Sequence, residues 1–399
     1  MTSSSTFECT ILDQQTDLAD FHLTAKEIGL AEDVPIRVQQ TCLHTGKEMG
    51  SRVLILTVGD TCIRLVPTRA MAILDVVHKG VFYGWESPVK EVVHPSFINL
   101  SASNGLGWLE GFNEMTARCG YQWTGHPGQD GDEFLTLHGR IQNIPANKIS
   151  LRIERQAPYQ IELIAQVHEK CFKSTNFELE TRLVTCLSSS RVNGDDTEQA
   201  AFLEVKDTLT NKGAYETEYQ VIYHNNFAGM LLEEGSKLLV PMAQISPFNH
   251  YAVSGLNEWN SMPAPTAYFD EMVFNIEPLS DEKGFSYALM HNKNADLGVL
   301  VSFASETLPR LTIWKNTDLK EQGYVVGIEP GTSFAYNRKY QRELDLVPKI
   351  GAGESIDFTM RFDFLTCHSK VQEQQVTLQA LQAKQKVKVK NEPLVDLDA

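Results

Sequence analysis

The chain has 399 residues, 42% of them hydrophobic, with a formal net charge of −16 and a pI near 5.2. Such a chain can bury a large core, either in several domains or in one large all-β unit. The excess of acidic residues argues against nucleic-acid binding, which needs a basic surface, and is compatible with a small neutral polyol as ligand.

The cysteines and the N-terminus favour a cytoplasmic location. Seven cysteines, at positions 9, 42, 62, 119, 171, 186 and 367, include no CxxC pair or zinc-binding spacing, which indicates reduced thiols. The N-terminal MTSSSTFECTILDQQ lacks the basic and apolar regions of a signal peptide. No apolar run approaches the ~20 residues of a membrane-spanning helix, so we expect no membrane contact. The sequence leaves the oligomeric state open.

In chain order, residues 1–50 are expected to pack on a larger domain as a strand or short helix at a sheet edge. Alternating apolar and polar residues then predict antiparallel strands with one wet face, clearest where Phe358, Met360, Phe362 and Phe364 alternate with polar side chains. The predicted strands are 52–58, 71–77, 150–155, 161–168, 176–187, 201–209, 218–223, 297–305, 323–328 and 357–365. Gly, Asn and Asp predict turns at 192–196, 211–213 and 351–353.

Helices longer than a few turns are not expected within 52–365, which excludes Rossmann and TIM-barrel folds. The pattern favours an all-β sandwich of large antiparallel sheets over residues 51–367. Residues 99–142 are rich in Gly, aromatic and polar residues with little periodicity, and a long irregular stretch of this kind is usually functional. Residues 368–399 are expected to form a partly helical or disordered tail.

Common cofactor motifs are missing from the sequence. It contains no GxxxxGK[ST], HExxH or GxSxG, and the glycines of Gly105-Leu-Gly107-Trp-Leu-Glu-Gly111 have the wrong spacing for a dinucleotide fingerprint. We therefore expect chemistry performed by side chains alone, with no cofactor and no metal.

Three segments concentrate His, Arg, Asn and Glu beside apolar residues. They are Thr136-Leu-His138-Gly-Arg140-Ile-Gln-Asn143-Ile-Pro145, Tyr223-His224-Asn225-Asn226-Phe227 and Val325-Val-Gly-Ile-Glu329-Pro330-Gly-Thr332, the last two at the ends of predicted strands.

These segments resemble the aldose 1-epimerase (galactose mutarotase-like) superfamily. Tyr223–Phe227 is similar to the family's segment with the catalytic His, and Gly327–Pro330 to the Glu segment, 105 positions downstream of His224. Leu137-His138-Gly139 is similar to the substrate-binding His segment. The resemblance covers about residues 52–365 and is closest to a branch with LHGR and IEP motifs. The Asn-Arg-rich segment that usually precedes LHG is not obvious, and Arg69 and Arg140 are candidate replacements.

The resemblance implies a large β-sandwich enzyme that interconverts the α and β anomers of a sugar. One group removes the proton of the C1 hydroxyl and another protonates the ring oxygen, so one carboxylate and one imidazole suffice. By analogy, Glu329 is the base and His224 the acid, and His138 binds the substrate.

Each candidate residue also has a structural interpretation. Glu329 can pair with a nearby cation such as Arg338, and His224 or His138 can fix a turn. Arg69 and Arg140 are candidate substrate contacts or structural ion pairs. Asn226 and His126 are further candidate contacts, although Asn is also common in turns. One of Trp85, Trp108, Trp123 and Trp314 is expected to pack on the sugar, because a pyranose has apolar C–H faces.

Three functions remain open: an aldose 1-epimerase, a hexose-phosphate epimerase and a carbohydrate-binding protein without turnover. A phosphate would need cations at one side of the pocket, for which Arg69, Arg140, Lys315 and Arg338 are available. A pure binder has no need of a matched acid and base, so His224 and Glu329 together favour an enzyme.

Overall fold

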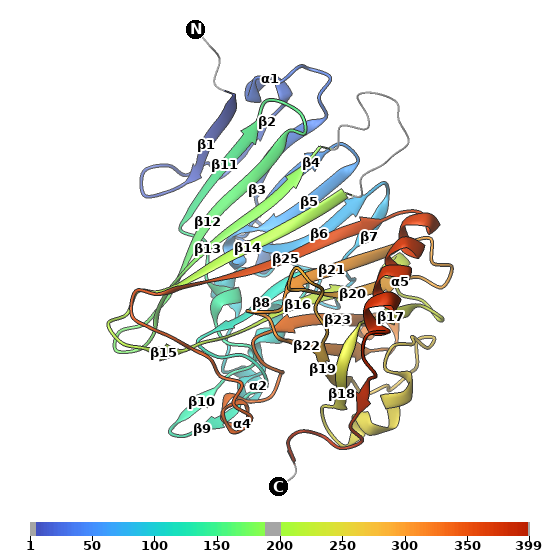
Figure 1. The fold of residues 1–399 in the computed structure, drawn as a ribbon. Helices are drawn as coiled ribbons and strands as arrows, with labels where there is room; N and C mark the ends of the chain where they lie inside the picture. Colours follow the sequence, from blue (N-terminus) through green and yellow to red (C-terminus); the bar gives the residue numbers. More distant parts are fainter. Residues whose placement is uncertain (1–4, 188–200, 398–399) are drawn as a thin grey trace.

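A computed structural model describes residues 5–187 and 201–397, which form two large β-sheets (Figure 1). The smaller sheet has nine described strands, all paired antiparallel. In spatial order they are β1 (Thr6–Leu12), β11 (Lys148–Glu154), β12 (Gln160–Lys170), β13 (Asn176–Cys186), β14 (Ala201–Asn211), β25 (Ser355–Leu365), β21 (Gly298–Ala304), β20 (Phe285–His291) and β17 (Lys237–Leu239).

The larger sheet has thirteen strands within the described residues, antiparallel except where β18 pairs with β26. In order they are β2 (Phe21–Leu23), β3 (Ile36–Cys42), β4 (Arg52–Val58), β5 (Thr61–Val66), β6 (Ala72–His78), β8 (Thr116–Tyr121), β16 (Gln220–Phe227), β23 (Val325–Gly331), β22 (Arg310–Asn316), β19 (Met272–Pro278), β18 (Met242–Pro247) and β26 (Lys388–Val389), with β7 (Val81–Tyr83) paired to β6.

Short elements connect the strands of the two sheets. Two small pairs join β9 (Gly128–Asp130) to β10 (Glu133–Leu135) and β15 (Thr217–Glu218) to β24 (Lys349–Ile350). The α-helices are α1 (Ala25–Ile28), α2 (Ala102–Gly105), α4 (Arg338–Glu343) and α5 (His368–Gln382). The 3-10 turns are η1 (Gly46–Glu48), η2 (Pro67–Arg69), η3 (Pro95–Phe97), η4 (Gly107–Gly111), η5 (Ile141–Asn143), η6 (Gly229–Leu231), η7 (Tyr251–Glu258) and η8 (Lys320–Gln322). None of the helices in the described part of the chain has the length and apolarity to span a membrane.

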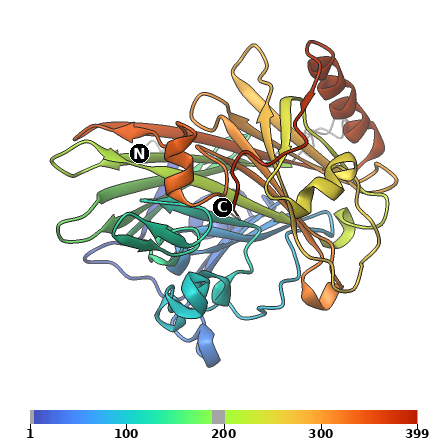
Figure 2. The same cartoon turned by 90° about the horizontal axis from the view of Figure 1, so that it is seen from below.

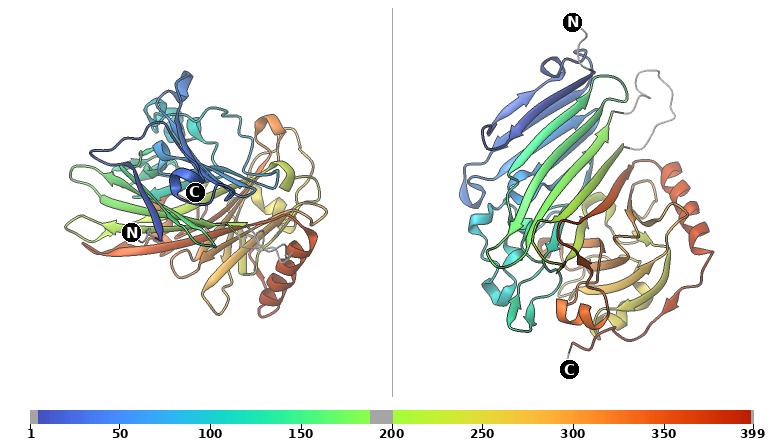
Figure 3. Two further views of the ribbon diagram at one scale, coloured as in Figure 1. Left: turned by 90° about the horizontal axis from the view of Figure 1, so that it is seen from above. Right: turned by 60° about the vertical axis from the view of Figure 1, so that its left-hand side comes forward.

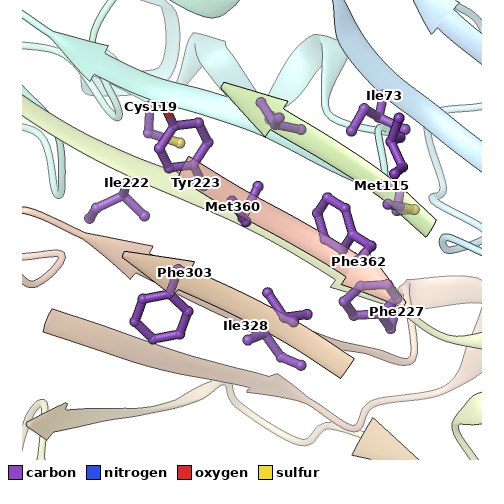
Figure 4. Close-up of a cluster of buried hydrophobic side chains, with 14 of the residues drawn as sticks. Ile73, Met115, Cys119, Ile222, Tyr223, Phe227, Phe303, Ile328, Met360 and Phe362 are labelled. Carbon is purple, nitrogen blue, oxygen red and sulfur yellow. The ribbon is translucent and has the colours of Figure 1, made fainter. Parts of the chain in front are cut away.

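The two sheets face each other as layers, with the blue strands of the larger sheet opposite the green strands of the smaller one (Figure 3). Apolar side chains fill the space between the layers. Figure 4 shows Phe227 and Ile328, from β16 and β23, beside Met360 and Phe362 of β25. The rings of Phe227 and Phe362 meet edge to face at a centroid distance of 6.4 Å. One face of β16 and β23 therefore belongs to the core of the sandwich.

This architecture confirms the predicted all-β sandwich. All ten predicted strands are present with ends shifted by a few residues, and Phe358, Met360, Phe362 and Phe364 are buried as expected. The turn expected at 192–196 lies outside the described residues. The strands β19 and β22 escape prediction because residues on both of their faces are buried, which removes the alternation.

The described parts of both terminal segments pack against the sheets. Strand β1 is an edge strand of the smaller sheet and pairs with β11, and β2 is an edge strand of the larger sheet. Helix α5 packs Val371 and Leu378 onto the outer face of the smaller sheet, against Leu289, Leu300 and Leu365. The hairpin β9–β10 and α4 lie beside each other in Figure 2, joined by an ion pair between Asp130 and Arg338 with a nitrogen-to-oxygen distance of 2.6 Å.

A buried ion pair joins the two sheets on the core side of the polar segment Tyr223–Phe227 of β16. Arg118 of β8 donates from Nε to Asp207 Oδ2 of β14 at 2.6 Å, and both side chains are fully buried. The hydroxyl of Tyr223 donates to the same oxygen at 2.8 Å. Since β16 carries Tyr223, this network fixes β16 relative to the opposite sheet.

Candidate active site

His224 and Glu329 are cross-strand neighbours on the larger sheet. The register pairs Asn225 with Ile328, which places His224 opposite Glu329, and Glu329 is in turn paired with Thr312 of β22. Directly paired residues project to the same face of a sheet. The predicted acid and base therefore share the face that points away from the core of the sandwich.

The imidazole and the carboxyl group are in contact. His224 Nε2 lies 3.2 Å from Glu329 Oε1, and both side chains are almost fully buried. The contact lacks hydrogen-bond geometry, and Glu329 Oε1 has no hydrogen-bond partner in the structure. Gly327 makes room for the carboxyl group, because a Cβ atom there would stand 2.6 Å from Glu329 Oε1.

His138 approaches from a loop with a constrained backbone. Its φ of 56° lies in the left-handed region, and its N–H donates to the carbonyl of Gly125 while its own carbonyl accepts from Gly120. A Cβ at Gly139 would stand 2.3 Å from the carbonyl oxygen of Trp123, so only glycine fits there. The loop thereby fixes the ring of His138, 5.7 Å from that of His224.

His138, His224 and Glu329 line one cavity. Its volume is about 110 Å³, which makes it a small cavity compared with typical small-molecule sites. Its lining residues are Leu106, Trp108, Leu109, Phe112, His126, Leu137, His138, His224, Glu271, Val273, Thr312, Trp314, Glu329 and Ala335.

Several buried polar atoms of this lining have no hydrogen-bond partner. They include Trp108 Nε1, His138 Nδ1, Thr312 Oγ1 and Glu329 Oε1. Buried polar groups are nearly always hydrogen-bonded, so these donors and acceptors can bond to water or to a polar ligand in the cavity.

Aromatic rings surround the two catalytic candidates. Phe112 and Trp314 lie 4.9 Å and 5.3 Å from the His224 ring, centroid to centroid, and Trp108 lies 5.0 Å from the His138 ring. Trp314 Nε1 donates to Glu271 Oε2 at 2.7 Å. Such walls exclude water and offer flat apolar faces to a sugar.

Burial sets the charge state of the site. It lowers the pKa of His224 to about 3, and raises the pKa of Glu329 well above its usual value with the help of the nearby carboxylate of Glu271. The pKa of His138 is also lowered, by burial and then by the neighbouring His224 and His126. The contact between His224 and Glu329 is therefore between neutral groups, because the cost of desolvating charges exceeds their attraction here.

Two of the predicted cations lie elsewhere. Arg69 is fully buried and pairs with Glu114, its Nε 2.6 Å from Oε1, while its Nη1 donates to Asn143. Arg140 donates to Gln122 at 2.9 Å and stacks on Trp123. Neither residue lines the cavity.

The remaining candidates divide between the cavity and its surroundings. His126 lines the cavity with His138, His224 and Glu329, whereas Asn226 lies beneath it and donates to the carbonyl of Glu114. Trp108 and Trp314 line the cavity, and Trp85 and Trp123 do not. Arg338 binds Asp130 and Glu133, so it is not the partner of Glu329.

Sequence reasoning missed Glu271, Thr312 and Phe112. Thr312 lies in β22, which is buried on both faces and therefore lacks the alternating pattern of a half-buried strand. Only the pairing of β22 with β23 places Thr312 opposite Glu329. Glu271 follows an exposed loop and carries no motif. Within residues 5–187 and 201–397, no cluster of three or more His, Cys, Asp or Glu side chains has a geometry that could hold a metal ion.

The fold and this cavity define a galactose mutarotase-like protein. A crystal structure of a candidate aldose 1-epimerase from Klebsiella pneumoniae subsp. pneumoniae matches with a TM-score of 0.93 and 39% identity over 98% of this chain and 100% of that chain. The chain belongs to the family described as domain of unknown function DUF4432, whose model matches residues 48–364. No curated protein sequence matches this chain.

More distant structures share the fold alone. A galactose mutarotase-like protein from Clostridium acetobutylicum has a TM-score of 0.52 and 14% identity over 83% of this chain and 99% of that chain. A galactose 1-epimerase from Lactobacillus acidophilus has a TM-score of 0.51 and 11% identity over 84% and 100%.

Proposed function

We propose that this protein is an isomerase of the aldose 1-epimerase type, which interconverts the α and β anomers of a neutral monosaccharide. The observation that carries the proposal is the contact of His224 Nε2 with Glu329 Oε1 at 3.2 Å in a buried cavity with unpartnered polar atoms. The relative from Klebsiella pneumoniae, described as a candidate aldose 1-epimerase, supports the same class of enzyme.

The chemistry consists of two proton transfers around one bond. Glu329 takes the proton of the C1 hydroxyl, the bond between C1 and the ring oxygen breaks, and its electron pair stays on the ring oxygen, which receives a proton from His224 Nε2. The open-chain aldehyde then turns about C1–C2. Ring closure on the other face reverses both transfers, so acid and base exchange roles.

The charge state of the site is consistent with this cycle. A neutral imidazole with a protonated carboxyl group holds the same number of protons as an imidazolium with a carboxylate, so the two states of His224 and Glu329 differ by one proton position. Burial favours the neutral state. Sugar hydroxyls that donate to Glu329 favour the charged state, because hydrogen bonds to a carboxylate lower its pKa.

The lining of the cavity favours a neutral substrate over a sugar phosphate. Among the described residues it contains two carboxyl side chains, Glu271 and Glu329, and no Lys or Arg. Lys315, one of the cations available for a phosphate, instead donates to the backbone carbonyls of Glu258 and Ser261. A phosphate in this cavity would be desolvated without a countercharge.

The test is NMR exchange spectroscopy of anomers across a panel of neutral sugars and their 6-phosphates. Wild type is expected to accelerate exchange of at least one neutral sugar, and Glu329→Gln and His224→Ala to lose ~10²–10⁴-fold of that acceleration. Glu343→Gln and His250→Ala, at exposed positions, are the matched controls. Binding of a sugar without accelerated exchange would contradict the enzyme and support a carbohydrate-binding protein.

We further propose a cytoplasmic location, supported by the seven free cysteines. We also propose that residues 51–367 form the mutarotase-like domain, with residues 1–50 and 368–399 packed on it as terminal segments. The match of the family model to residues 48–364 supports this division.

A further inference from the structure

The geometry points to Asn226 as the residue that fixes the tautomer of His224. Its side-chain oxygen accepts the proton on Nδ1, so that Nε2 carries the lone pair facing Glu329. The inference rests on the proposed function only for the catalytic role of His224. The hydrogen bond between Asn226 and His224 can be tested in the resting protein, without any substrate.

The orientation of the Asn226 amide follows from its other contacts. Nδ2 donates to the backbone carbonyl of Glu114 at 2.9 Å and to that of His224 at 3.3 Å. Two carbonyl acceptors require the nitrogen at that position and exclude the flipped amide. The oxygen Oδ1 must therefore point the other way, where it is buried and has no partner of good hydrogen-bond geometry.

His224 Nδ1 is the matching unpartnered atom. It is buried and has no hydrogen bond of its own, and it lies on the same face of β16, two positions from Asn226. The ring neighbours Phe112 and Trp314 offer aromatic carbon edges and faces in place of an acceptor. The Asn226 side chain also raises the pKa of His224, against the larger effect of burial, as an oxygen that accepts from the ring would do.

The tautomer decides what His224 can do. With the proton on Nδ1, neutral His224 presents a lone pair at Nε2 that can accept from a protonated Glu329 or from a sugar hydroxyl. With the proton on Nε2, the ring would present a donor to a carboxyl group that already carries a proton. Asn226 is thus a positioning residue. The hydrogen bond that one ring nitrogen of a histidine makes decides which tautomer the ring adopts, and so whether the other nitrogen donates or accepts a proton.

The support of Asn226 continues into the buried network under the cavity. Asn226 donates to the backbone carbonyl of Glu114, and the side chain of Glu114 is held by Arg69 and Gln142. Gln142 Nε2 donates to Glu114 Oε1 at 2.9 Å. Arg69 therefore contributes to the site through Glu114 and Asn226 and does not line the cavity itself.

The first experiment records long-range ¹H–¹⁵N spectra of the full chain labelled at histidine, without sugar, at pH 7. His224→Gln identifies the His224 signals by their loss. The expected spectrum shows a protonated Nδ1 and an unprotonated Nε2. A proton on Nε2 in the wild-type protein overturns the inference.

Variants then test whether Asn226 is the cause. Asn226→Leu has nearly the same shape without the acceptor and is expected to lose the single tautomer, whereas Asn226→Asp keeps an oxygen for Nδ1 and retains it. Asn225→Leu is the matched control, because Asn225 projects to the opposite face and its Nδ2 donates to the carbonyl of Ile328. An unchanged tautomer in folded Asn226→Leu overturns the inference.

Kinetics separate this inference from the proposed function. We expect kcat to fall ~10–100-fold in Asn226→Leu with little change in KM, and to recover partly in Asn226→Asp. If the tautomer is as stated but wild type accelerates no anomer exchange, the proposed function fails and the role of Asn226 stands. If wild type is active and Asn226→Leu keeps full kcat, the role of Asn226 is overturned.

Discussion

Glu329 faces His224 across two neighbouring strands, its Oε1 atom 3.2 Å from the imidazole Nε2, although 105 positions separate the residues in the chain. Burial lowers the pKa of His224 and raises that of Glu329, which favours the neutral form of both groups. The pair is therefore set up for proton exchange with a ligand, and the raised pKa of Glu329 weakens the fold at neutral pH.

Glu329→Gln is expected to slow anomer exchange ~10²–10⁴-fold while stabilising the protein. The folded-state pKa of Glu329 lies above its unfolded value of about 4.5, so its contribution to stability is complete below that pH and is lost as the pH rises through the folded pKa. A Gln side chain does not titrate, so the variant does not lose this stability as the pH rises. Thermal unfolding should show a higher Tm for the variant at pH 8 and a smaller difference at pH 4, and a lower Tm at pH 8 would contradict this account.

His224 predicts the acid limb of the pH–rate profile. Its pKa is lowered to about 3, so the free enzyme should keep a neutral imidazole well below the usual histidine titration near pH 6.5. We expect kcat/KM to stay nearly constant from pH 7 down to pH 5. A tenfold decline over that range, with the fold intact by circular dichroism, would show that His224 titrates normally.

Gly327→Ala tests the space reserved for the Glu329 carboxyl group. The added Cβ would stand 2.6 Å from Oε1 and push the carboxyl group out of line with His224. A displacement of ~1 Å at a reacting group can cost ~10²-fold, so we expect kcat to fall by about that factor. Gly213→Ala, in a turn outside the cavity lining, is the control in the same assay, and equal activity of both variants would rule out this steric role.

Asp207→Ala should destabilise the sandwich far more than loss of a peripheral ion pair. It leaves Arg118 buried between the sheets without a countercharge and removes the acceptor of Tyr223, at a cost of ~3–5 kcal/mol. Asp363→Ala, which breaks a more exposed pair with Arg361, should cost ~0–1 kcal/mol. Urea unfolding measures both values, and similar midpoints would contradict the structural role of Asp207.

The sequence by itself determined the class of fold and the identity of the catalytic candidates. Alternation in strands such as β25 was readable because one face is buried and the other wet, and His224 and Glu329 stand in short motifs at strand ends. Glu271 and Thr312 were unreadable, because a loop and a strand buried on both faces carry no periodic signal.

Only the tertiary structure decided which polar residues meet. Arg69, Arg140 and His138 look alike in sequence as possible ligand contacts, yet strand register and loop geometry bring His138 into the cavity and direct Arg69 to Glu114 and Arg140 to Gln122. The physical reason is that buried charges must find partners, and those partners come from strands far apart in the chain, so the sheet pairing settles which residues are left facing the cavity.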